Sequence, residues 1–243
     1  MKYQVTAPIV DVYGVPDLKA QRGKFETQLV YGEIFTVEEE KDGWCKGACA
    51  HDNYPGYVES IHLTKHAVPA THIVTAARSH TFRDPSINSP FMGTLGFGSL
   101  IKVTGTDQGF VQVHGDAWIF EKHIAPIGST DKDYIATARK FLETPYYWGG
   151  RSGFGIDCSG LVQVSLARAG IAAPRDSDIQ ENSIGKAVDK AQAGDIIFFK
   201  GHVGLMADDR NLLHANAFHM KTVIEPLDDV VARGNAVTSV RRV

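Results

Sequence analysis

The fold of the second half of this chain is decided by residues 146–160, which read YYWGGRSGFGIDCSG. A glycine-rich loop ends in this stretch and a helical pattern begins, with Cys158 in the first turn and Asp157 as a possible N-cap. The unpaired N–H groups and the positive dipole end of a helix N-terminus both favour thiolate over thiol. We therefore expect Cys158 to be a nucleophile with a lowered pKa rather than a buried, inert cysteine.

Two helices are expected around this loop. Upstream, Thr130 and Asp133 resemble a capping box, and an apolar stripe continues to Thr144-Pro145. Downstream, small and apolar residues recur at intervals of three and four until Gly170. These residues are Cys158, Leu161, Val162, Ser165, Leu166 and Ala169. The second stripe places Cys158 on the inward side of its helix.

Three strand-like runs follow, at residues 194–199, 202–207 and 211–216. A loop at 208–210 would pair Leu205 with Leu213 and make His202 and His214 near-diagonal neighbours on one face, about 7–8 Å apart at the backbone. Alternate apolar residues would occupy the other face. The pattern therefore predicts one buried face and one working face.

The two histidines supply what a nucleophilic thiol needs. A cysteine nucleophile requires a base beside it and a third group that orients the base. Histidine suits the base because its ordinary pKa lies near neutrality. We assign Cys158 as nucleophile, His202 as general base and His214 as the orienting residue. No metal or cofactor is expected.

The first 125 or so residues contain an internal repeat. At an offset of 66, Gly43 and Trp44 align with Gly109 and Phe110, and at an offset of 61, Tyr57 aligns with Trp118. Further aligned pairs are Leu29 with Leu95, Tyr31 with Phe97, Gly32 with Gly98, Val58 with Ile119 and His62 with His123. Both copies have short β-rich runs broken by turn signals. The repeat predicts two small all-β barrels, at residues 1–66 and 67–128, before a third domain at residues 129–243.

The aromatic residues of the two copies are expected to be mostly core, with one or two lining a groove as the alternative. They are Tyr31, Trp44, Tyr57, Phe97, Phe110 and Trp118. Cys45 and Cys49 lie near His51, but a fourth metal ligand with suitable spacing is missing, so small core residues are the expected reading.

Composition excludes several partner classes. The formal net charge is -3 and charged residues make up 22% of the chain, which predicts neither nucleic-acid nor membrane binding. The first residues lack the pattern of a secretion signal, and no stretch approaches the ~18 apolar residues of a membrane span. We expect a cytoplasmic monomer or weak dimer; a trimmed sequence would leave a periplasmic or extracellular location open.

The motifs of the second half resemble the NlpC/P60 family of cysteine peptidases. The resemblance rests on the motif around Cys158, the strand 194–199, the step beginning at His202 and the step containing His214, and it spans residues 130–243. It implies a papain-like α+β fold that cleaves bacterial cell-wall stem peptides between γ-D-glutamate and a diamino acid. The first half is similar to bacterial SH3 domains.

The resemblance also implies roles for residues around the nucleophile. Tyr146 matches a family tyrosine whose hydroxyl lies near the thiol, where it would help the Cys158 N–H to bind an oxyanion; a packing aromatic is the alternative. Asp157, Ser159 and Trp148 are further candidates for substrate binding.

Asp176 and Ser177 resemble a pair that receives the free α-ammonium of the substrate in family members with N-terminal SH3-like domains. A carboxylate and a hydroxyl suit a buried ammonium, whereas helix capping is the alternative role. The implied function is a γ-D-glutamyl-diaminopimelate endopeptidase that recycles murein-derived peptides with a free N-terminal L-Ala. The alternatives are a cysteine amidase or acyltransferase acting on intact peptidoglycan, and a non-catalytic module that binds wall peptides.

Overall fold

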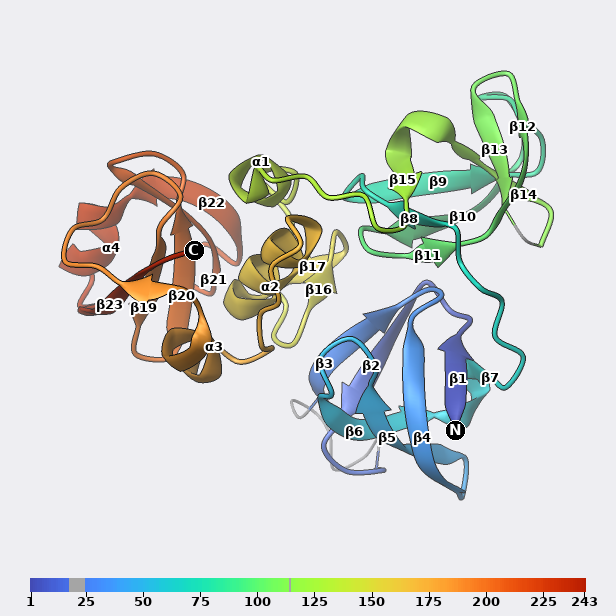
Figure 1. The fold of residues 1–243 in the computed structure, drawn as a ribbon, viewed down its shortest axis with the longest axis horizontal. Helices are drawn as coiled ribbons and strands as arrows, with labels where there is room; N and C mark the ends of the chain where they lie inside the picture. The colour runs from blue at the N-terminus through green and yellow to red at the C-terminus, as the bar shows by residue number, and fades with distance from the viewer. Residues whose placement is uncertain (18–24, 114) are drawn as a thin grey trace. The chain divides into compact units, whose positions relative to one another are not determined.

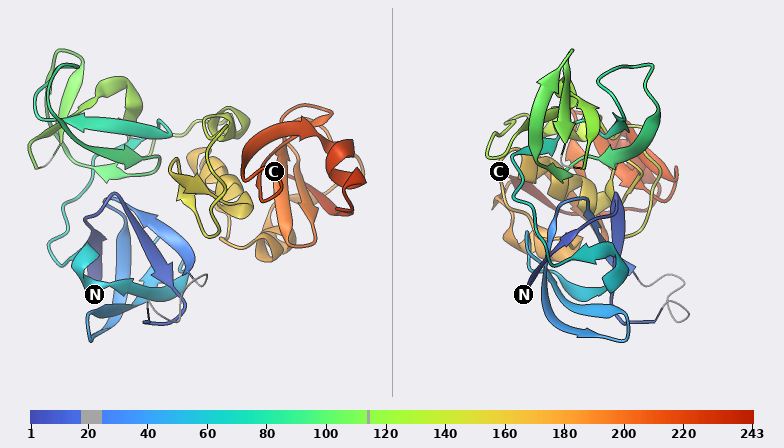
Figure 2. Two further views of the ribbon diagram at one scale, coloured as in Figure 1. Left: turned by 180° about the vertical axis from the view of Figure 1, so that it is seen from behind. Right: turned by 90° about the vertical axis from the view of Figure 1, so that its right-hand side faces the viewer.

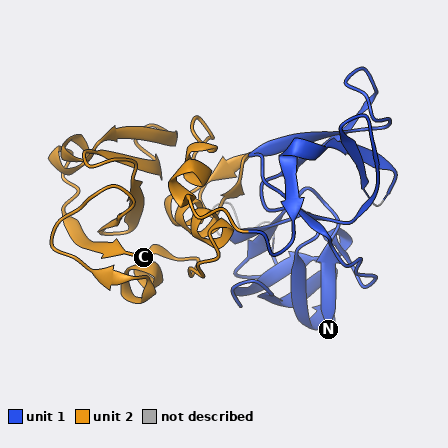
Figure 3. Cartoon of the chain, turned by 45° about the horizontal axis from the view of Figure 1, so that its top comes forward, with its two compact units in different colours: residues 1–129 blue, residues 130–243 orange. Residues whose placement is uncertain are grey.

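The computed structural model describes residues 1–17, 25–113 and 115–243 of the chain. The chain separates into two compact units, Met1–Ser129 and Thr130–Val243, which Figure 3 shows in different colours. Each unit has its own buried core. Among the described residues, none of the helices has the length and apolar character needed to cross a bilayer.

The first unit begins with a seven-stranded antiparallel sheet in the order β3-β2-β6-β5-β4-β1-β7 (Figure 1). Its elements are β1 (Lys2–Val5), β2 (Ile9–Tyr13), β3 (Phe25–Val30), β4 (Ile34–Lys41), β5 (Trp44–Cys49), β6 (Pro55–Glu59), the 3-10 helix η1 (Ser60–His62) and β7 (Leu63–Thr64). Inward-facing residues alternate along these strands, as in β2, where Val10 and Val12 are buried.

The second copy of the repeat pairs its strands in the same order but as two sheets, β10-β9-β14-β13-β12 and β11-β8-β15. Its elements are β8 (His72–Val74), β9 (Arg78–Phe82), β10 (Phe91–Gly96), β11 (Leu100–Ile101), β12 (Val103–Asp107), β13 (Phe110–Val113), β14 (Ala117–Phe120), the 3-10 helix η2 (Glu121–His123) and β15 (Ile124–Pro126). The counterpart of β4 is broken between β11 and β12, which divides the sheet. The internal repeat is thus confirmed at the level of strand order.

Matching turns precede β5 and β13. Asp42 and Gly43 both have positive φ angles, 50° and 81°, and Gln108 and Gly109 have 48° and 79°. Two successive residues with positive φ are typical of a type I′ hairpin turn, which needs glycine at one of these positions. The turn signals of the two copies therefore serve the same purpose.

The expected core was partly wrong in these strands. Phe97 and Phe110 are buried, but Tyr31, Trp44, Tyr57 and Trp118 are only half-buried. Trp44 and Tyr57 line an open surface pocket. Cys45 and Cys49 are both fully buried in the apolar core of the first copy, as the structural reading predicts.

The second unit is an α+β domain built on a six-stranded antiparallel sheet, in the order β18-β23-β19-β20-β21-β22. Its helices are α1 (Tyr134–Arg139), α2 (Cys158–Arg168), α3 (Ser177–Ser183) and α4 (Leu227–Ala232). Its strands are β16 (Arg151–Ser152), β17 (Gly155–Ile156), β18 (Lys186–Ala187), β19 (Ile196–Phe199), β20 (His202–Met206), β21 (Asn211–Asn216), β22 (Lys221–Pro226) and β23 (Val237–Arg242).

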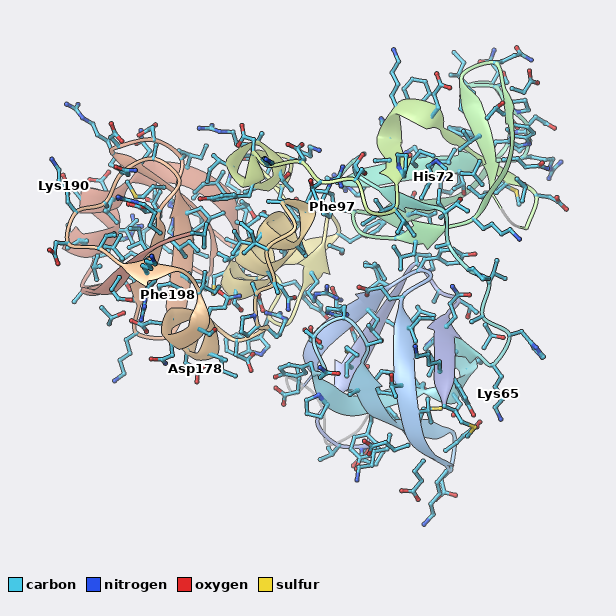
Figure 4. The ribbon with its side chains drawn as sticks, viewed as in Figure 1. Lys65, His72, Phe97, Asp178, Lys190 and Phe198 are labelled. Atoms are coloured by element: carbon cyan, nitrogen blue, oxygen red, sulfur yellow. The ribbon has the colours of Figure 1, made fainter. Side chains whose placement is uncertain are left out.

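The predicted division into two faces is confirmed in part: the alternate apolar residues of β20 and β21 are fully buried on one face, and His202 and His214 line a pocket on the other. The far end of that second face is covered as well. Helix α2 packs against β20 and β21 on one side. On the other side Met206 and Leu212 join an apolar cluster with Val230 of α4, and Figures 1 and 2 show α2 and α4 on opposite sides of the sheet. Phe198, labelled in Figure 4, is fully buried in β19 between these layers.

The ends of the helices differ in part from the sequence prediction. Asp157 is the N-cap of α2, as predicted, and its side chain accepts a hydrogen bond from the Gly160 N–H. The N-cap of α1 is Asp133, which accepts from the Ala136 N–H, and not Thr130 as a capping box would require. The aspartate lies directly before the first helical residue, so its carboxylate is the nearer acceptor for the free N–H groups of that turn.

Candidate active site

The two histidines meet where the sequence predicts. Leu205 pairs with Leu213 across β20 and β21, which confirms the predicted register. His202 Nε2 lies 2.7 Å from His214 Nδ1, and the two ring centroids are 5.0 Å apart. His214 is 1% exposed and His202 is half-buried at the start of its strand. The Nε2 atom of His202 is therefore engaged, and its Nδ1 atom is the one left for another partner.

Cys158 lies at the first position of α2, directly against the start of β20. Its side chain is buried, with 8% of the residue exposed. The backbone N–H groups of Val203 and Ser159 hydrogen-bond to the sulfur. Because Val203 follows His202 in β20, these contacts bring the N-terminus of α2 and the histidine strand together.

The direction of the thiol pKa differs from the sequence prediction. Burial, followed by the charge of Asp157, raises the pKa of the Cys158 thiol to about 12. The helix N-terminus predicts a lowered pKa, but desolvation disfavours the thiolate more strongly than the neighbouring N–H groups and Arg175 favour it. The thiol is therefore protonated at neutral pH in the unliganded protein.

The histidines are also uncharged at neutral pH. Burial and the neighbouring His214 lower the pKa of His202 to about 3, although Glu225 acts in the opposite direction. Burial likewise lowers the pKa of His214. Both shifts favour the uncharged forms, a thiol and an imidazole, so attack by the sulfur would require transfer of the thiol proton to a base.

Tyr146 lines an open pocket of about 580 Å³ together with His202 and His214. Its ring is half-buried, and burial, followed by the charges of Cys158 and Asp157, raises the pKa of its phenol. The phenol therefore stays a hydrogen-bond donor through neutral and mildly alkaline pH. In the described part of the chain it donates to no protein acceptor, which leaves it available to a ligand.

Asp157 and Ser159 are turned into the protein. Both Asp157 oxygens are engaged: Oδ1 accepts from the Gly160 N–H at 2.7 Å, and Oδ2 accepts from the Gly149 N–H at 2.7 Å. Ser159 Oγ accepts from Arg175 Nη1 at 2.8 Å. These side chains hold the start of α2 in place, and direct substrate binding by either stays a prediction.

The other predicted binding residues lie at the surface or near it. Trp148 is 64% exposed in the loop before Cys158. Asp176 is the N-cap of α3 but makes no capping hydrogen bond through its side chain, and Ser177 is the first residue of that helix. Both are half-buried. The structure therefore does not show the side-chain hydrogen bond that a helix-capping role for Asp176 requires.

Sequence reasoning missed Glu225 and Arg233. Glu225 Oε1 lies 2.8 Å from His214 Nε2, and Arg233 donates to both oxygens of Glu225, at 2.6 and 2.8 Å. In β22 the residue Val223 pairs with His214, so Glu225 is the diagonal neighbour of the histidine. A strand prediction at residues 221–226 would have found Glu225, because it is the one acidic residue in that run and would lie diagonally across from His214.

Two family models match the chain. The NlpC/P60 family model matches residues 143–241, which include Cys158, His202, His214 and Tyr146. The model described as a bacterial dipeptidyl-peptidase Sh3 domain matches residues 19–63.

Individual relatives agree with these matches. The chain is 30% identical to a gamma-D-glutamyl-L-lysine dipeptidyl-peptidase of Bacillus subtilis, over 78% of this chain and 72% of that protein. It is 27% identical to dipeptidyl-peptidase 6 of Lysinibacillus sphaericus, over 93% and 91%. A solved NlpC/P60 family structure from Bacillus cereus shares the fold, with a TM-score of 0.85, 24% identity and coverage of 100% and 99%. The chain therefore belongs to the NlpC/P60 family of peptidases and carries an N-terminal bacterial SH3 domain.

Proposed function

We propose that the protein is a cysteine endopeptidase that hydrolyses the γ-D-glutamyl bond to an L-diamino acid in murein stem peptides with a free N-terminal L-Ala. The observation that carries the proposal is the placement of the Cys158 thiol against the strand that begins with His202, itself bonded to His214. The names of the relatives support the bond. A diaminopimelate or lysine residue would follow the scissile bond.

In the proposed reaction the Cys158 sulfur attacks the γ-carbonyl carbon of D-glutamate while His202 takes the thiol proton. The tetrahedral oxyanion would be bound by the Cys158 N–H and the Tyr146 hydroxyl. His202 then gives its proton to the leaving amine, and a thioester forms. A water molecule, deprotonated by His202, attacks the thioester and releases the free γ-carboxylate and the thiol.

Asp176 and Ser177 would receive the α-ammonium of L-Ala. Their position supports this role, because both follow Arg175, which is bonded to the N-cap of the nucleophile helix. A carboxylate held half-buried next to a hydroxyl suits an ammonium, which loses much of its hydration on binding. The site would then prefer peptides with a free amino terminus to intact, cross-linked murein.

The domain division and cellular role belong to the same proposal. Residues 1–66 and 67–128 would be two SH3-like barrels, supported by their shared strand order, and residues 129–243 a papain-like peptidase domain. A requirement for a free amino terminus would suit an enzyme that recycles released wall peptides. We place this role in the cytoplasm and assign it to a monomer or weak dimer.

The test is product analysis with the full chain. L-Ala-γ-D-Glu-L-Lys and the diaminopimelate analogue should yield L-Ala-γ-D-Glu and the free diamino acid, whereas N-acetylated peptides and intact sacculi should react far more slowly. Cys158→Ala should abolish cleavage. Cleavage of sacculi at the rate of the free tripeptide would contradict the recycling role, and transfer to an added amine in preference to water would identify an acyltransferase.

A further inference from the structure

Behind the two catalytic histidines lies an acidic residue that completes a continuous chain of hydrogen bonds. His202 Nε2 lies 2.7 Å from His214 Nδ1, and His214 Nε2 lies 2.8 Å from Glu225 Oε1. Both distances are short enough for well-formed hydrogen bonds. Each nitrogen in the chain is therefore committed either to donate or to accept.

Counting protons along this chain fixes the tautomer of each imidazole. An ionised carboxylate can only accept, so Nε2 of His214 has to carry the proton. A neutral imidazole has a single N–H, so Nδ1 of His214 is a lone pair and accepts from His202 Nε2–H. The proton of His202 is then on Nε2, and its Nδ1 lone pair is the free base.

The geometry keeps Glu225 ionised. Burial alone would raise the pKa of Glu225, but hydrogen bonds from Arg233, His214 and His219 together lower it to about 2. Arg233 binds both carboxylate oxygens, and its guanidinium stacks 4.4 Å from the ring centroid of Phe218. Such a bidentate pair is strong and directional. Glu225 is thus held as an acceptor facing His214.

The Glu225 carboxylate is needed as an acceptor because the amide of Asn216 competes for the same nitrogen of His214. Asn216 Nδ2 lies 3.0 Å from the same His214 Nε2, and Asn216 Oδ1 accepts from the His219 backbone N–H at 2.8 Å. The amide therefore presents its N–H to His214 Nε2, where it cannot form a hydrogen bond as long as Nε2–H donates to Glu225. Without the carboxylate, this amide would donate to Nε2 and reverse both tautomers. His202 would then direct Nδ1–H at the thiol and could not accept a proton.

We propose that Glu225 is a positioning residue which, through His214, sets the tautomer of His202 and leaves its Nδ1 free to accept the proton of Cys158. The row of Cys158, His202 and His214 thus extends to Glu225, which touches neither substrate nor thiol. This inference rests on the proposed cysteine chemistry, but the tautomer of His202 can be read without any substrate.

The direct test is 15N NMR of the histidine-labelled full chain at neutral pH, with signals assigned from single His→Gln variants. The expected result is Nε2–H for both His202 and His214 in the wild-type protein, and Nδ1–H for His202 in Glu225→Leu. Nδ1–H for His202 in the wild-type protein would overturn the proposal. Because the wild-type tautomers are read without any substitution at Glu225, a Glu225→Leu variant that fails to fold does not remove the test.

Kinetics give the second readout. We expect Glu225→Leu to lower kcat by about 10- to 100-fold, part of what general-base catalysis contributes, with KM nearly unchanged. Glu225→Gln should lose less, because an amide oxygen can still accept from His214 and preserve the tautomer. The matched control is Glu143→Gln, which removes a carboxylate from an exposed ion pair with Lys221 and should leave kcat unchanged. Equal kcat in Glu225→Leu and the control would contradict the proposal.

The alkylation rate of Cys158 by iodoacetamide separates this inference from the proposed substrate. If the peptide is not cleaved but alkylation slows in Glu225→Leu and not in Glu143→Gln, the substrate assignment fails and the positioning role stands. If the peptide is cleaved and both variants react like the wild-type protein, the positioning role fails.

Discussion

Arg175 and Asp157 form a buried ion pair that joins the segment before α3 to the N-cap of α2, the helix that begins with Cys158. Arg175 Nη2 donates to Asp157 Oδ2 at 2.6 Å and Nη1 to Oδ1 at 3.0 Å, and the two residues are 2% and 6% exposed. The same guanidinium also donates to Ser159. The residue that precedes the proposed ammonium site therefore also helps to fix the position of Cys158, the proposed nucleophile.

Replacing Arg175 by methionine should destabilise the second unit strongly. It leaves a buried carboxylate with its two backbone donors and a long hydrogen bond of 3.4 Å from the Ser159 hydroxyl. Removing one partner of a buried pair typically costs about 3–5 kcal/mol. Urea unfolding, followed by the helical circular-dichroism signal, measures the loss, because α1 to α4 all lie in this unit. Lys221→Met, which breaks an exposed pair with Glu143, should cost no more than about 1 kcal/mol. A similar loss of unfolding free energy in both variants would show that the buried pair stabilises the unit no more than the exposed pair does.

Tyr146→Phe should lower kcat with little change in KM. The hydroxyl is proposed to meet the oxyanion and not the ground-state carbonyl, and loss of one such donor costs about 100- to 1000-fold where it has been tested. Steady-state kinetics on the tripeptide measure the effect. Tyr134→Phe is the control, since it removes a hydroxyl that donates to the Gly194 carbonyl at 2.7 Å. A change in KM alone would assign Tyr146 to ground-state binding.

Asp176→Asn should weaken the preference for a free amino terminus. If the carboxylate receives the ammonium of L-Ala, loss of a charged hydrogen bond costs about 1.5–3 kcal/mol, so kcat/KM for the free tripeptide falls by about 10- to 100-fold. The N-acetylated peptide, which has no ammonium, should be affected much less. Asp178→Asn, an exposed neighbour in α3 that Figure 4 labels, is the matched control. An equal fall for both peptides would place the ammonium elsewhere.

The parts of the site that follow from local pattern could be predicted from the sequence. A three-residue loop between two strands fixes the register, and the register places His202 beside His214. An aspartate before a helical stripe predicts the N-cap at Asp157. These features depend on residues close together in the chain, where turn length and periodicity determine geometry.

The parts that depend on tertiary packing could not be predicted in this way. The Asp157–Arg175 pair joins residues 18 apart, across a helix and a loop without periodicity. Glu225 reaches His214 only through the pairing of β22 with β21. The pKa of Cys158 moves against the helix dipole because burial by the rest of the domain outweighs that local effect.

The buried histidines should make the second unit less stable as the pH falls. The folded-state pKa of His202 is about 3 and that of His214 is also lowered, whereas both titrate near 6.5 in the unfolded chain. Below pH 6.5 the unfolded chain binds protons that the folded protein does not, so acid favours unfolding. The contribution is fully present above pH 6.5 and is lost between about 6.5 and 3. Each group adds at most about 1.4 kcal/mol per pH unit.

His202→Gln should therefore flatten the dependence of unfolding free energy on pH between 7 and 5, measured by urea unfolding with the helical circular-dichroism signal. The slope, and not the stability at one pH, is the test, because the substitution itself also changes packing. His66→Gln replaces an exposed histidine of the first unit and should leave the slope unchanged. An unchanged slope in His202→Gln would mean that the imidazole binds a proton in the folded protein. The resting site would then contain an imidazolium beside the thiol, contrary to the neutral pair derived from its burial.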